Sequence, residues 1–385
     1  MALHPSTLFR SRRAVAAMVG VAALGVGAFA ALATSQPPPV AAVATPSPSP
    51  SASPTPRRTP RPTPSPSPTP TPVPVAVCPL DGLPVAAGMD EHATALAVQI
   101  ENHAAARPAR NLSRADMVVE ATVEGDSTRF TGIFLCNPTE GMTGPVRSAR
   151  YYNVDLWRDL HVLTVGFGAS GGANARFSAA GMPYPNGING GWPWYRRHGS
   201  RAAPHNLYVD LEGLRAGVAG HAGLAALAAR VEPVRPPFTF AAQPELPADG
   251  QRIASLTIQT ASYWRFGWTW DGASSTWLRS DAGSAVVDEV TGDRLAATTV
   301  VVQRVTEEVV TGDPDPGGND RRLHHLVGTG NGTIFVGGRA HAARWSRPTA
   351  GDGTTWTFAN GEPVVLPPGQ VWLEIVPTHA SVTAR

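Results

Sequence analysis

Cysteine is scarce in this sequence: the 385 residues contain only Cys78 and Cys136. No histidine flanks either cysteine at the spacing of zinc ligands, which excludes a zinc site built on this pair. We expect neither a metal nor a cofactor. Outside the cytoplasm two cysteines often form a disulfide, and this one would close a long loop. Two free, buried thiols are the alternative, because sequence alone does not show that the two residues meet.

Acidic residues are absent from the first 75 positions, which contain six arginines. The formal charge of +2 for the whole chain therefore corresponds to +2 − 6 = −4 for residues 76–385. A mildly acidic folded part argues against a basic surface for nucleic acid, and no aromatic-basic motif of the RNA-binding kind is present. Nucleic acid is thus not expected as a partner.

An uncharged, apolar run from Ala14 to Ala33 follows three nearby arginines. A positive region before an apolar segment long enough to cross ~30 Å of hydrocarbon predicts export. The run ends in small residues that fit a cleavage site. We expect residues 1–35 to be a cleaved signal peptide or a retained membrane anchor, with the rest of the chain outside the cytoplasm.

Residues 36–75 are rich in Pro, Ser and Thr. This composition favours extended polyproline II and cannot bury a core, so we expect a disordered linker. At ~3.1 Å per residue such a segment could reach about 100 Å. That length suits a tether that crosses a cell-wall layer.

The sequence after the linker changes in character near residue 235. Strand-like and helix-like runs alternate before that point, with strands expected at 96–100, 117–123, 129–135 and 161–167 and helices at 153–159, 173–180 and 211–231. This alternation predicts a mixed α/β domain over residues 76–235. Afterwards, short β-like runs separated by turns such as Gly328 to Gly332 predict a mostly antiparallel β domain over residues 236–385. The expected fold class is α/β with a β-rich C-terminal part.

The stretch Gly144–Arg150 reads Gly-Pro-Val-Arg-Ser-Ala-Arg, directly before a helical pattern. Its two arginines, Arg147 and Arg150, carry planar guanidinium groups that suit bidentate capture of carboxylate or phosphate. A helix N-terminus adds backbone N–H groups. This segment is therefore predicted to handle an anion.

Other polar residues lie at or near the predicted strand ends, and we expect them to join these arginines in one cluster. The predicted binding residues are Asn102, Arg107, Glu120, Glu124, Arg129, Arg147, Arg150, His205 and Asn206. Histidine switches protonation near neutral pH, so Glu120 or Glu124 could act with His205 as acid and base. Alternatively, the cluster is a buried salt-bridge network that only holds strands together.

The sequence Gly168 to Gly172 matches Gly-x-Ser-x-Gly between a predicted strand and a predicted helix. A hydrolase triad would need an acid between Ser170 and His205, and none is present. Glycine here more simply predicts a tight strand-to-helix turn. We therefore assign no catalytic residue.

Several motifs taken together identify a likeness to a known family. They are Ala97–His103, Ala115–Glu120, Val123–Gly125 with Thr128–Phe130, Gly144–Arg150, Ala203–Tyr208 and Gly369–Trp372. This combination resembles the YerB-like family, bacterial proteins described as lipoproteins and of uncharacterised function. The resemblance runs from about Cys78 to Thr378. It implies an α/β portion followed by a C-terminal portion in a layered β-β-α arrangement, anchored outside the cytoplasmic membrane.

No cysteine ends the apolar run at Ala33, so a peptide anchor or a cleaved signal would replace the lipid of this family. We expect an exported, membrane-tethered or secreted protein of the cell envelope. An Arg/Glu/His cleft would bind an anionic or glycan component of the wall, or an envelope protein. An envelope hydrolase or transferase is one alternative, and a structural or protein-interaction module is another.

Overall fold

The computed structural model describes residues 75–182, 184–190 and 193–385. The predicted signal peptide or anchor (1–35) and the predicted linker (36–75) lie outside the described residues, apart from residue 75. Within the described ranges, no helix is long and apolar enough to span a membrane.

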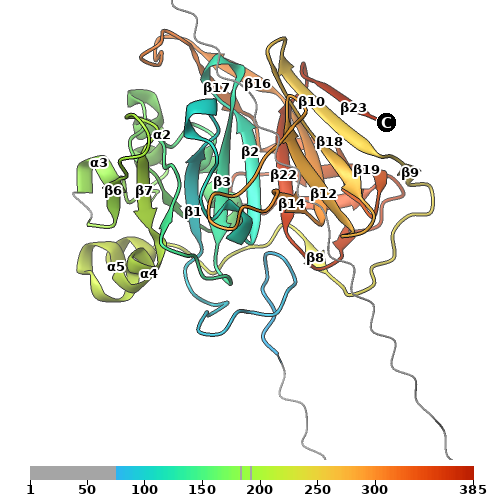
Figure 1. Ribbon diagram of the computed structural model, residues 1–385, viewed down its shortest axis with the longest axis horizontal. Helices are drawn as coiled ribbons and strands as arrows, with labels where there is room; N and C mark the ends of the chain where they lie inside the picture. Colours follow the sequence, from blue (N-terminus) through green and yellow to red (C-terminus); the bar gives the residue numbers. More distant parts are fainter. Residues whose placement is uncertain (1–74, 183, 191–192) are drawn as a thin grey trace, which may run out of the picture. The chain divides into compact units, whose positions relative to one another are not determined.

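A large sheet runs through the described part and takes strands from both halves of the chain (Figure 1). Its order is β20-β19-β18-β15-β22-β2-β3-β1-β5, and the short β9 pairs with β19. The strands are β1 (Leu96–Glu101), β2 (Met117–Thr122), β3 (Thr128–Phe134), β5 (Leu163–Val165), β9 (Gln251–Arg252), β15 (Thr299–Val305), β18 (Gly328–Val336), β19 (Arg339–Arg347), β20 (Thr355–Phe358) and β22 (Val371–Pro377). Strand β1 pairs with β5 in parallel, as β22 does with both β2 and β15, and the other pairs of this sheet are antiparallel.

Strand β22 joins the two halves of the large sheet. Val371 lies opposite Met117 of β2 on one side and opposite Thr299 of β15 on the other. Every residue of β22 is buried, as expected of a strand that is covered on both faces. Residues from both predicted domains, 76–235 and 236–385, therefore hydrogen bond within one sheet.

A second, antiparallel sheet packs against one face of the large sheet. Its order is β13-β12-β11-β10-β23, with β14 beside β12. The strands are β10 (Ser255–Ala261), β11 (Trp264–Asp271), β12 (Thr276–Asp281), β13 (Ser284–Ala285), β14 (Ala296–Ala297) and β23 (Ser381–Ala384). Trp268 meets Trp372 with ring centroids 4.9 Å apart, and Trp277 meets Phe335 at 6.0 Å. These aromatic side chains form the core between the sheets.

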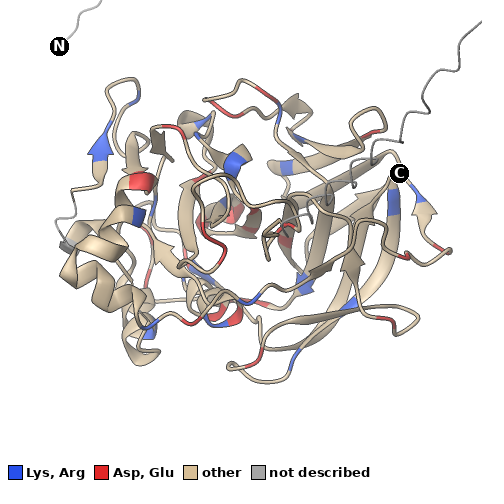
Figure 2. Cartoon of the chain, turned by 90° about the horizontal axis from the view of Figure 1, so that it is seen from below, with Lys and Arg blue, Asp and Glu red and all other residues tan. Residues whose placement is uncertain are grey.

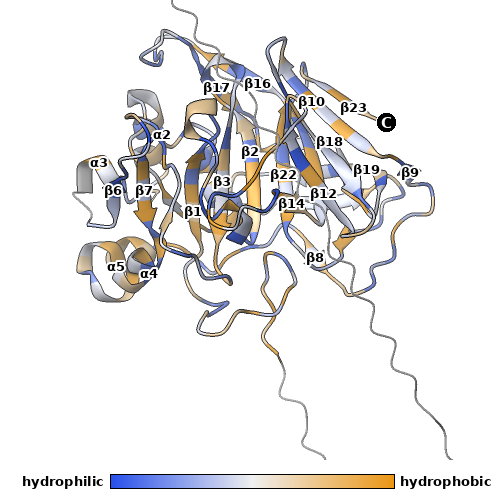
Figure 3. Ribbon diagram, in the orientation of Figure 1, coloured by the Kyte–Doolittle hydropathy of each residue, from blue (hydrophilic) through white to orange (hydrophobic). Residues whose placement is uncertain are grey.

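The helices are α1 (Asn153–Leu160), α2 (Gly171–Ala179), α3 (Gly187–Gly190), α4 (Leu211–Gly220) and α5 (Ala222–Ala228). Helices α4 and α5 contribute Leu214 and Leu224 to the core that also contains Leu96, Val98 and Ile100 of β1. Helix α1 contributes Leu156 and Leu160 to a different core, on the other face of the large sheet. Figure 3 shows hydrophobic residues concentrated in central strands such as β1 and β2. The predicted mixed α/β class is confirmed, with β-sheet the larger part.

The single helix expected over 211–231 is wrong, because α4 ends at Gly220 and α5 begins at Ala222. His221 between them has an extended backbone. Its side chain accepts a hydrogen bond from the backbone N–H of Leu224 at 3.4 Å and so caps α5.

The turn expected at Gly328 to Gly332 is also wrong, since these residues belong to β18. Two indoles cover this glycine-rich strand. A Cβ at Gly330 would lie 2.4 Å from Trp345, and one at Gly332 would lie 2.5 Å from Trp356. The glycines therefore permit a close approach of side chains to the backbone rather than a reversal of the chain.

Small sheets and single turns complete the described part. The small sheets contain β4 (Met142–Thr143), β6 (Tyr195–Arg197) and β7 (Leu207–Asp210); β16 (Glu307–Val310) and β17 (Arg321–His324); and β8 (Thr239–Phe240) and β21 (Val365–Leu366). Short 3-10 turns cover Ala104–Ala106, Leu112–Arg114 and Glu124–Asp126. The last of these turns connects β2 to β3, and β17 begins with Arg321, so both bring charged side chains to the site described below.

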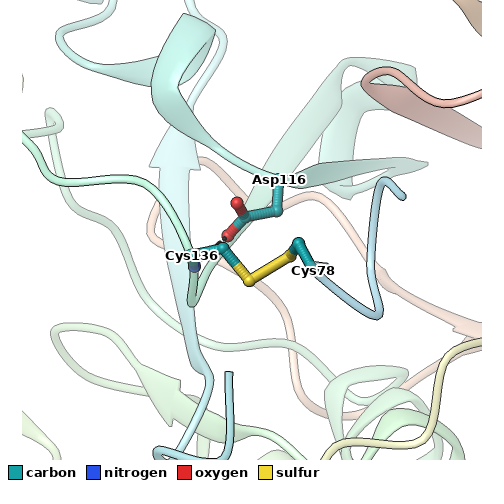
Figure 4. Close-up of side chains that lie close together, drawn as sticks. All are labelled: Cys78, Asp116 and Cys136. Carbon is teal, nitrogen blue, oxygen red and sulfur yellow. Dashed lines mark hydrogen bonds between the residues drawn. A yellow bond between two sulfur atoms is a disulfide. The ribbon is translucent and has the colours of Figure 1, made fainter. Parts of the chain in front are cut away.

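A disulfide joins Cys78 to Cys136 across a sequence separation of 58 residues (Figure 4). Asp116 lies beside it and accepts hydrogen bonds from the backbone N–H groups of Leu135 (2.5 Å) and Cys136 (3.0 Å). The Asp116 carboxylate and both sulfurs lie within 4.8 Å of one another. Because both sulfurs are bonded to each other, this group offers no thiolate to a metal.

Candidate functional site

The single polar cluster expected from the sequence is divided by the large sheet. Successive residues of a strand point to opposite faces. Ile100, Phe130 and Glu120 are aligned across β1, β3 and β2, whereas Glu101 is aligned with Arg129. Glu120 therefore points to the face covered by the second sheet, and Arg129 points to the opposite face. The prediction that these two residues share one site is wrong.

A buried group of charges lies between the two sheets, and we call it the intersheet cluster. Its members are Asn102, Arg107, Glu120, Arg279, Asp281 and Glu374. Arg279 donates to both carboxylate oxygens of Glu120, at 2.9 and 3.0 Å. It also lies 3.1 Å from Asp281, which in turn pairs with Arg107 at 2.7 Å. Burial by itself would lower the pKa of Arg279, but Glu120 and Asp281 raise it.

Glu374 lies opposite Glu120 in the sheet register. It accepts a hydrogen bond from the indole of Trp268 at 2.9 Å. Burial first, and then the charge of Glu120, raise the pKa of Glu374 well above its ordinary value. The side chains of Glu120 and Arg279 are fully buried. The intersheet cluster therefore holds the sheets together and does not meet solvent at its centre.

The opposite face of the large sheet carries a second group, which we call the arginine cluster. Its members are Glu101, Glu124, Arg129, Arg147, Arg150, His205 and Arg321. Glu124 accepts from Arg150 at 2.7 and 2.8 Å and pairs with Arg321 at 2.9 Å. Burial alone would raise the pKa of Glu124, but the two arginines lower it to about 2.

Glu101 organises the other end of the arginine cluster. It lies 3.3 Å from the Nε atom of Arg147 and 3.1 Å from Nδ1 of His205. His205 in turn stacks on His103, with ring centroids 5.0 Å apart. Sequence reasoning did not select Glu101 as a site residue. Its position at the end of β1, on the same face as Arg129, is the signal that would have identified it.

Arg129 has the least compensated charge in the arginine cluster. It donates one hydrogen bond to the carbonyl of Ser148 at 3.0 Å, and its Nε atom is buried without a partner. Among the described residues no carboxylate lies within 4.0 Å of its guanidinium. Burial, followed by Arg150 and Arg147, lowers the pKa of Arg129 to about 9. The group is still protonated at neutral pH, so a cation is held here without a direct counter-charge.

The arginine cluster therefore has more positive than negative charge. Four guanidiniums face the carboxylates of Glu101 and Glu124. A further carboxylate, Asp313, accepts a hydrogen bond from the Tyr151 hydroxyl at 2.7 Å and is influenced by Arg321. Asp313 and Asp315 lie at the margin of the cluster, within electrostatic range of Arg321 and Glu124 respectively, so the excess of cations holds for the seven members alone. Figure 2 shows acidic and basic positions interspersed over the rest of the described part, so the local excess is not a property of the whole surface.

The predicted binding residue Asn206, and Ser170 of the Gly-x-Ser-x-Gly match, have supporting contacts instead. The side chain of Asn206 accepts from Arg197 at 2.8 Å and donates to the carbonyl of Arg201 at 3.0 Å, which secures the loop that carries His205. Ser170 accepts from the backbone N–H of Ala173 at 3.2 Å and caps α2. The predicted strand-to-helix turn is therefore present, with Ser170 as a helix cap.

Acid is expected to weaken the fold through Glu124. Its pKa in the folded chain, about 2, lies below its ordinary value of 4.5. A carboxyl with a depressed folded pKa stabilises the fold above its unfolded pKa, and this stability is lost as the pH falls towards the folded pKa. As the pH falls between those two values, protonation of Glu124 should lower the free energy of unfolding by up to about 1.4 kcal/mol per pH unit. Urea unfolding at a series of pH values measures the slope.

Glu124→Gln provides the control for this slope. The variant has no titrating group at the position, so its unfolding free energy should fall less steeply over the same acid range. Equal slopes in the two proteins would show that the arginines do not depress the pKa of Glu124.

Comparison with known proteins places both clusters within a recognised family. The family described as "Protein of unknown function (DUF3048) N-terminal domain" matches residues 80–224, and its C-terminal domain matches residues 254–373. The Bacillus subtilis (strain 168) protein named "Putative lipoprotein YerB" is 27% identical over 300 residues, which cover 78% of this chain and 86% of that protein. The crystal structure of YerB from Bacillus subtilis matches with a TM-score of 0.67 and 25% identity, over 80% of this chain and 99% of the solved chain. Both matched segments contribute residues to each cluster.

Proposed function

This chain belongs to the DUF3048 family of proteins of unknown function, and from that premise we propose that it is an extracytoplasmic, membrane-tethered protein of the cell envelope. Its similarity to a protein named as a lipoprotein supports this location. The arginines and apolar run within residues 1–35 support it as well. Because no cysteine ends that run, a peptide anchor or a cleaved signal would replace the lipid.

The family likeness also supports two proposals about architecture. One is that residues 76–235 and 236–385 correspond to the two domains of the family, although both contribute strands to one sheet. The other is that the layers follow a β-β-α order. Residues 36–75 would form the tether between this part and the membrane.

We propose that the arginine cluster binds an anionic or glycan component of the envelope. The observation that carries this proposal is Arg129, a buried guanidinium that no carboxylate among the described residues contacts directly, although Glu124 and Glu101 act on it from further away. An anion that contacted it would supply the missing counter-charge and accept hydrogen bonds from its unused N–H groups. The chain contains no lysine, so each permanently charged cation in the cluster is an arginine. Its planar guanidinium suits bidentate binding of carboxylate or phosphate.

The same cluster has an accessible side. The side chain of Arg147 is 26% exposed and that of His205 is 22% exposed, whereas Glu101 between them is 4% exposed. A ligand would therefore approach Arg147 and His205 first, with Arg129 behind them. Glu101 orients both outer groups and limits their movement.

Arg147→Gln should weaken binding of the full chain to wall glycan fractions that retain their anionic polymers. A hydrogen bond to a charged group contributes about 1.5–3 kcal/mol, which corresponds to roughly a ten- to hundred-fold rise in Kd. Calorimetric titration with the glycan fraction and with inorganic phosphate measures the change.

Arg344→Gln serves as the matched control, because Arg344 is exposed on β19 and is not part of either cluster. This variant should bind like the parent. Equal binding by Arg147→Gln and the parent would refute the assignment of the ligand to this cluster.

An envelope hydrolase or transferase is the second candidate, supported by the contact between His205 and Glu101 at 3.1 Å. A carboxylate that orients a histidine is the arrangement expected of a general base. In this proposal Glu101 is the carboxylate that acts with His205. Glu120 is not suitable because it lies on the other face of the sheet. Glu124 is not suitable because arginines occupy both of its oxygens. Release of glycan fragments by the parent but not by His205→Gln would support it. A purely structural role fits the intersheet cluster better than the arginine cluster.

A further inference from the structure

A cavity of about 570 Å³ lies beside the C-terminal end of α1. Its walls include Trp157, Arg158, His161, Arg230, Glu232 and Arg235. None of these residues belongs to the arginine cluster or to the intersheet cluster. The volume falls within the range of small-molecule sites, ~300–1,000 Å³.

Three arginines converge on this cavity from two parts of the chain. Arg158 lies in α1, whereas Arg230 and Arg235 follow α5. The C-terminal ends of α1, α2 and α5 all favour nearby cations, and three arginines here face one cavity. The one carboxylate of the lining, Glu232, is 75% exposed and lies 3.4 Å from His161. The lining therefore has a net positive charge.

Much of the hydrogen-bonding capacity of these arginines is unused. Arg230 donates to the carbonyl of Gly181, and Arg235 donates to the carbonyl of Gly351 at 3.1 Å and contacts His161. Each guanidinium has five N–H donors, so both retain free ones. The side chain of Arg158 makes no hydrogen bond or ion pair with any residue that the structure describes.

Trp157 adds an aromatic wall to the same cavity. Its indole nitrogen is buried, so Trp157 offers the cavity ring surface and not a hydrogen-bond donor. A tryptophan presents a large apolar surface with one polar handle. Apolar surface beside several cations matches a ring that carries both hydroxyls and an anionic group better than it matches a simple inorganic anion.

We propose that this cavity is a second binding site, which takes a sugar ring bearing a carboxylate or a phosphate. The ring packs against Trp157, and the anionic group is held by Arg158 and Arg230. This site is independent of the ligand proposed for the arginine cluster. It would give the protein two separate contacts with an acidic polymer, or a contact with a smaller acidic sugar.

Calorimetry on the full chain tests the proposal with four probes: digalacturonate, glucose 6-phosphate, cellobiose and inorganic phosphate. At least one of the two acidic sugars should bind with a Kd at least ten-fold below those of cellobiose and inorganic phosphate. The acidic sugar that binds more tightly identifies carboxylate or phosphate as the natural group. Arg158→Gln and Arg230→Gln should each raise that Kd at least ten-fold, whereas Arg344→Gln should leave it unchanged.

Three results would overturn this second site. One is the absence of binding by either acidic sugar at millimolar concentration. Another is equal affinity for inorganic phosphate and the sugars, which would indicate an adventitious anion only. The third is loss of binding in Arg147→Gln with retention in Arg158→Gln, which would place the ligand at the arginine cluster. Because Arg158 has no partner to lose, its variant should melt at the parent temperature, so a loss of affinity cannot be attributed to unfolding.

Discussion

Arg279→Met should lower the free energy of unfolding by about 3–5 kcal/mol. Arg279 is fully buried between the two sheets and pairs with both Glu120 and Asp281. Its removal leaves two buried carboxylates with Arg107 as their only other cation in the intersheet cluster. The guanidinium also lies 4.3 Å from the ring centroid of Phe266, so packing is lost as well as charge.

Urea unfolding of the parent and the variant measures this cost, and Arg265→Met is the matched control. Arg265 is exposed on β11, next to Phe266 in sequence, so its substitution should change stability by less than ~0.5 kcal/mol. The double variant Arg279→Met with Glu120→Gln should lose less than the single variant, because one uncompensated charge is gone. A single-variant cost below ~1 kcal/mol would contradict the picture of a mutually dependent charge group.

Replacing Cys78 and Cys136 by alanine should cost about 4 kcal/mol of unfolding free energy. The disulfide closes a loop with a sequence separation of 58 residues. In the chain-entropy description, a cross-link over that distance restricts the unfolded chain by about this amount. Both cysteines are also buried, so the double variant loses some packing in the folded state.

Denaturant unfolding with and without a reductant separates these contributions. The midpoint of the parent should fall on reduction, whereas the midpoint of the alanine variant should not change. If the oxidised and reduced parent unfold at the same midpoint, the disulfide does not stabilise the fold.

The strands of the first half were predicted to within about one residue at most ends, because their apolar runs are continuous and flanked by polar turns. Strand β12 was missed for a physical reason. Its buried positions include Arg279 and Asp281 beside Trp277, so its alternation is not an alternation of apolar and polar residues. A hydrophobic pattern does not identify buried positions that are occupied by paired charged residues. The break at His221 was missed because the Ala/Leu-rich pattern continues on both sides of it, although Gly220 is a residue that favours a helix end.

Most residues of the candidate site were predicted, but their division into two clusters was not. Glu124, Arg129, Arg147, Arg150 and His205 are brought together as expected, through the arginine cluster. Glu120 was misplaced because a strand's register decides which face each residue occupies, and register depends on pairing between distant segments. Arg321 and Arg279 were not found for the same reason, since each comes from the far half of the chain. The resemblance to the YerB-like family is confirmed.

Strand β22 has a consequence for how a newly made chain reaches its final form. It is the last strand of the large sheet to leave the ribosome, yet it fills the gap between β2 and β15. Until Val371–Pro377 emerge, both neighbours present unpaired backbone edges, which are templates for pairing with other chains. A partly made chain can therefore pair with its copies through these edges until Val371–Pro377 are available. A chain truncated shortly before Val371 would leave these edges of β2 and β15 unpaired.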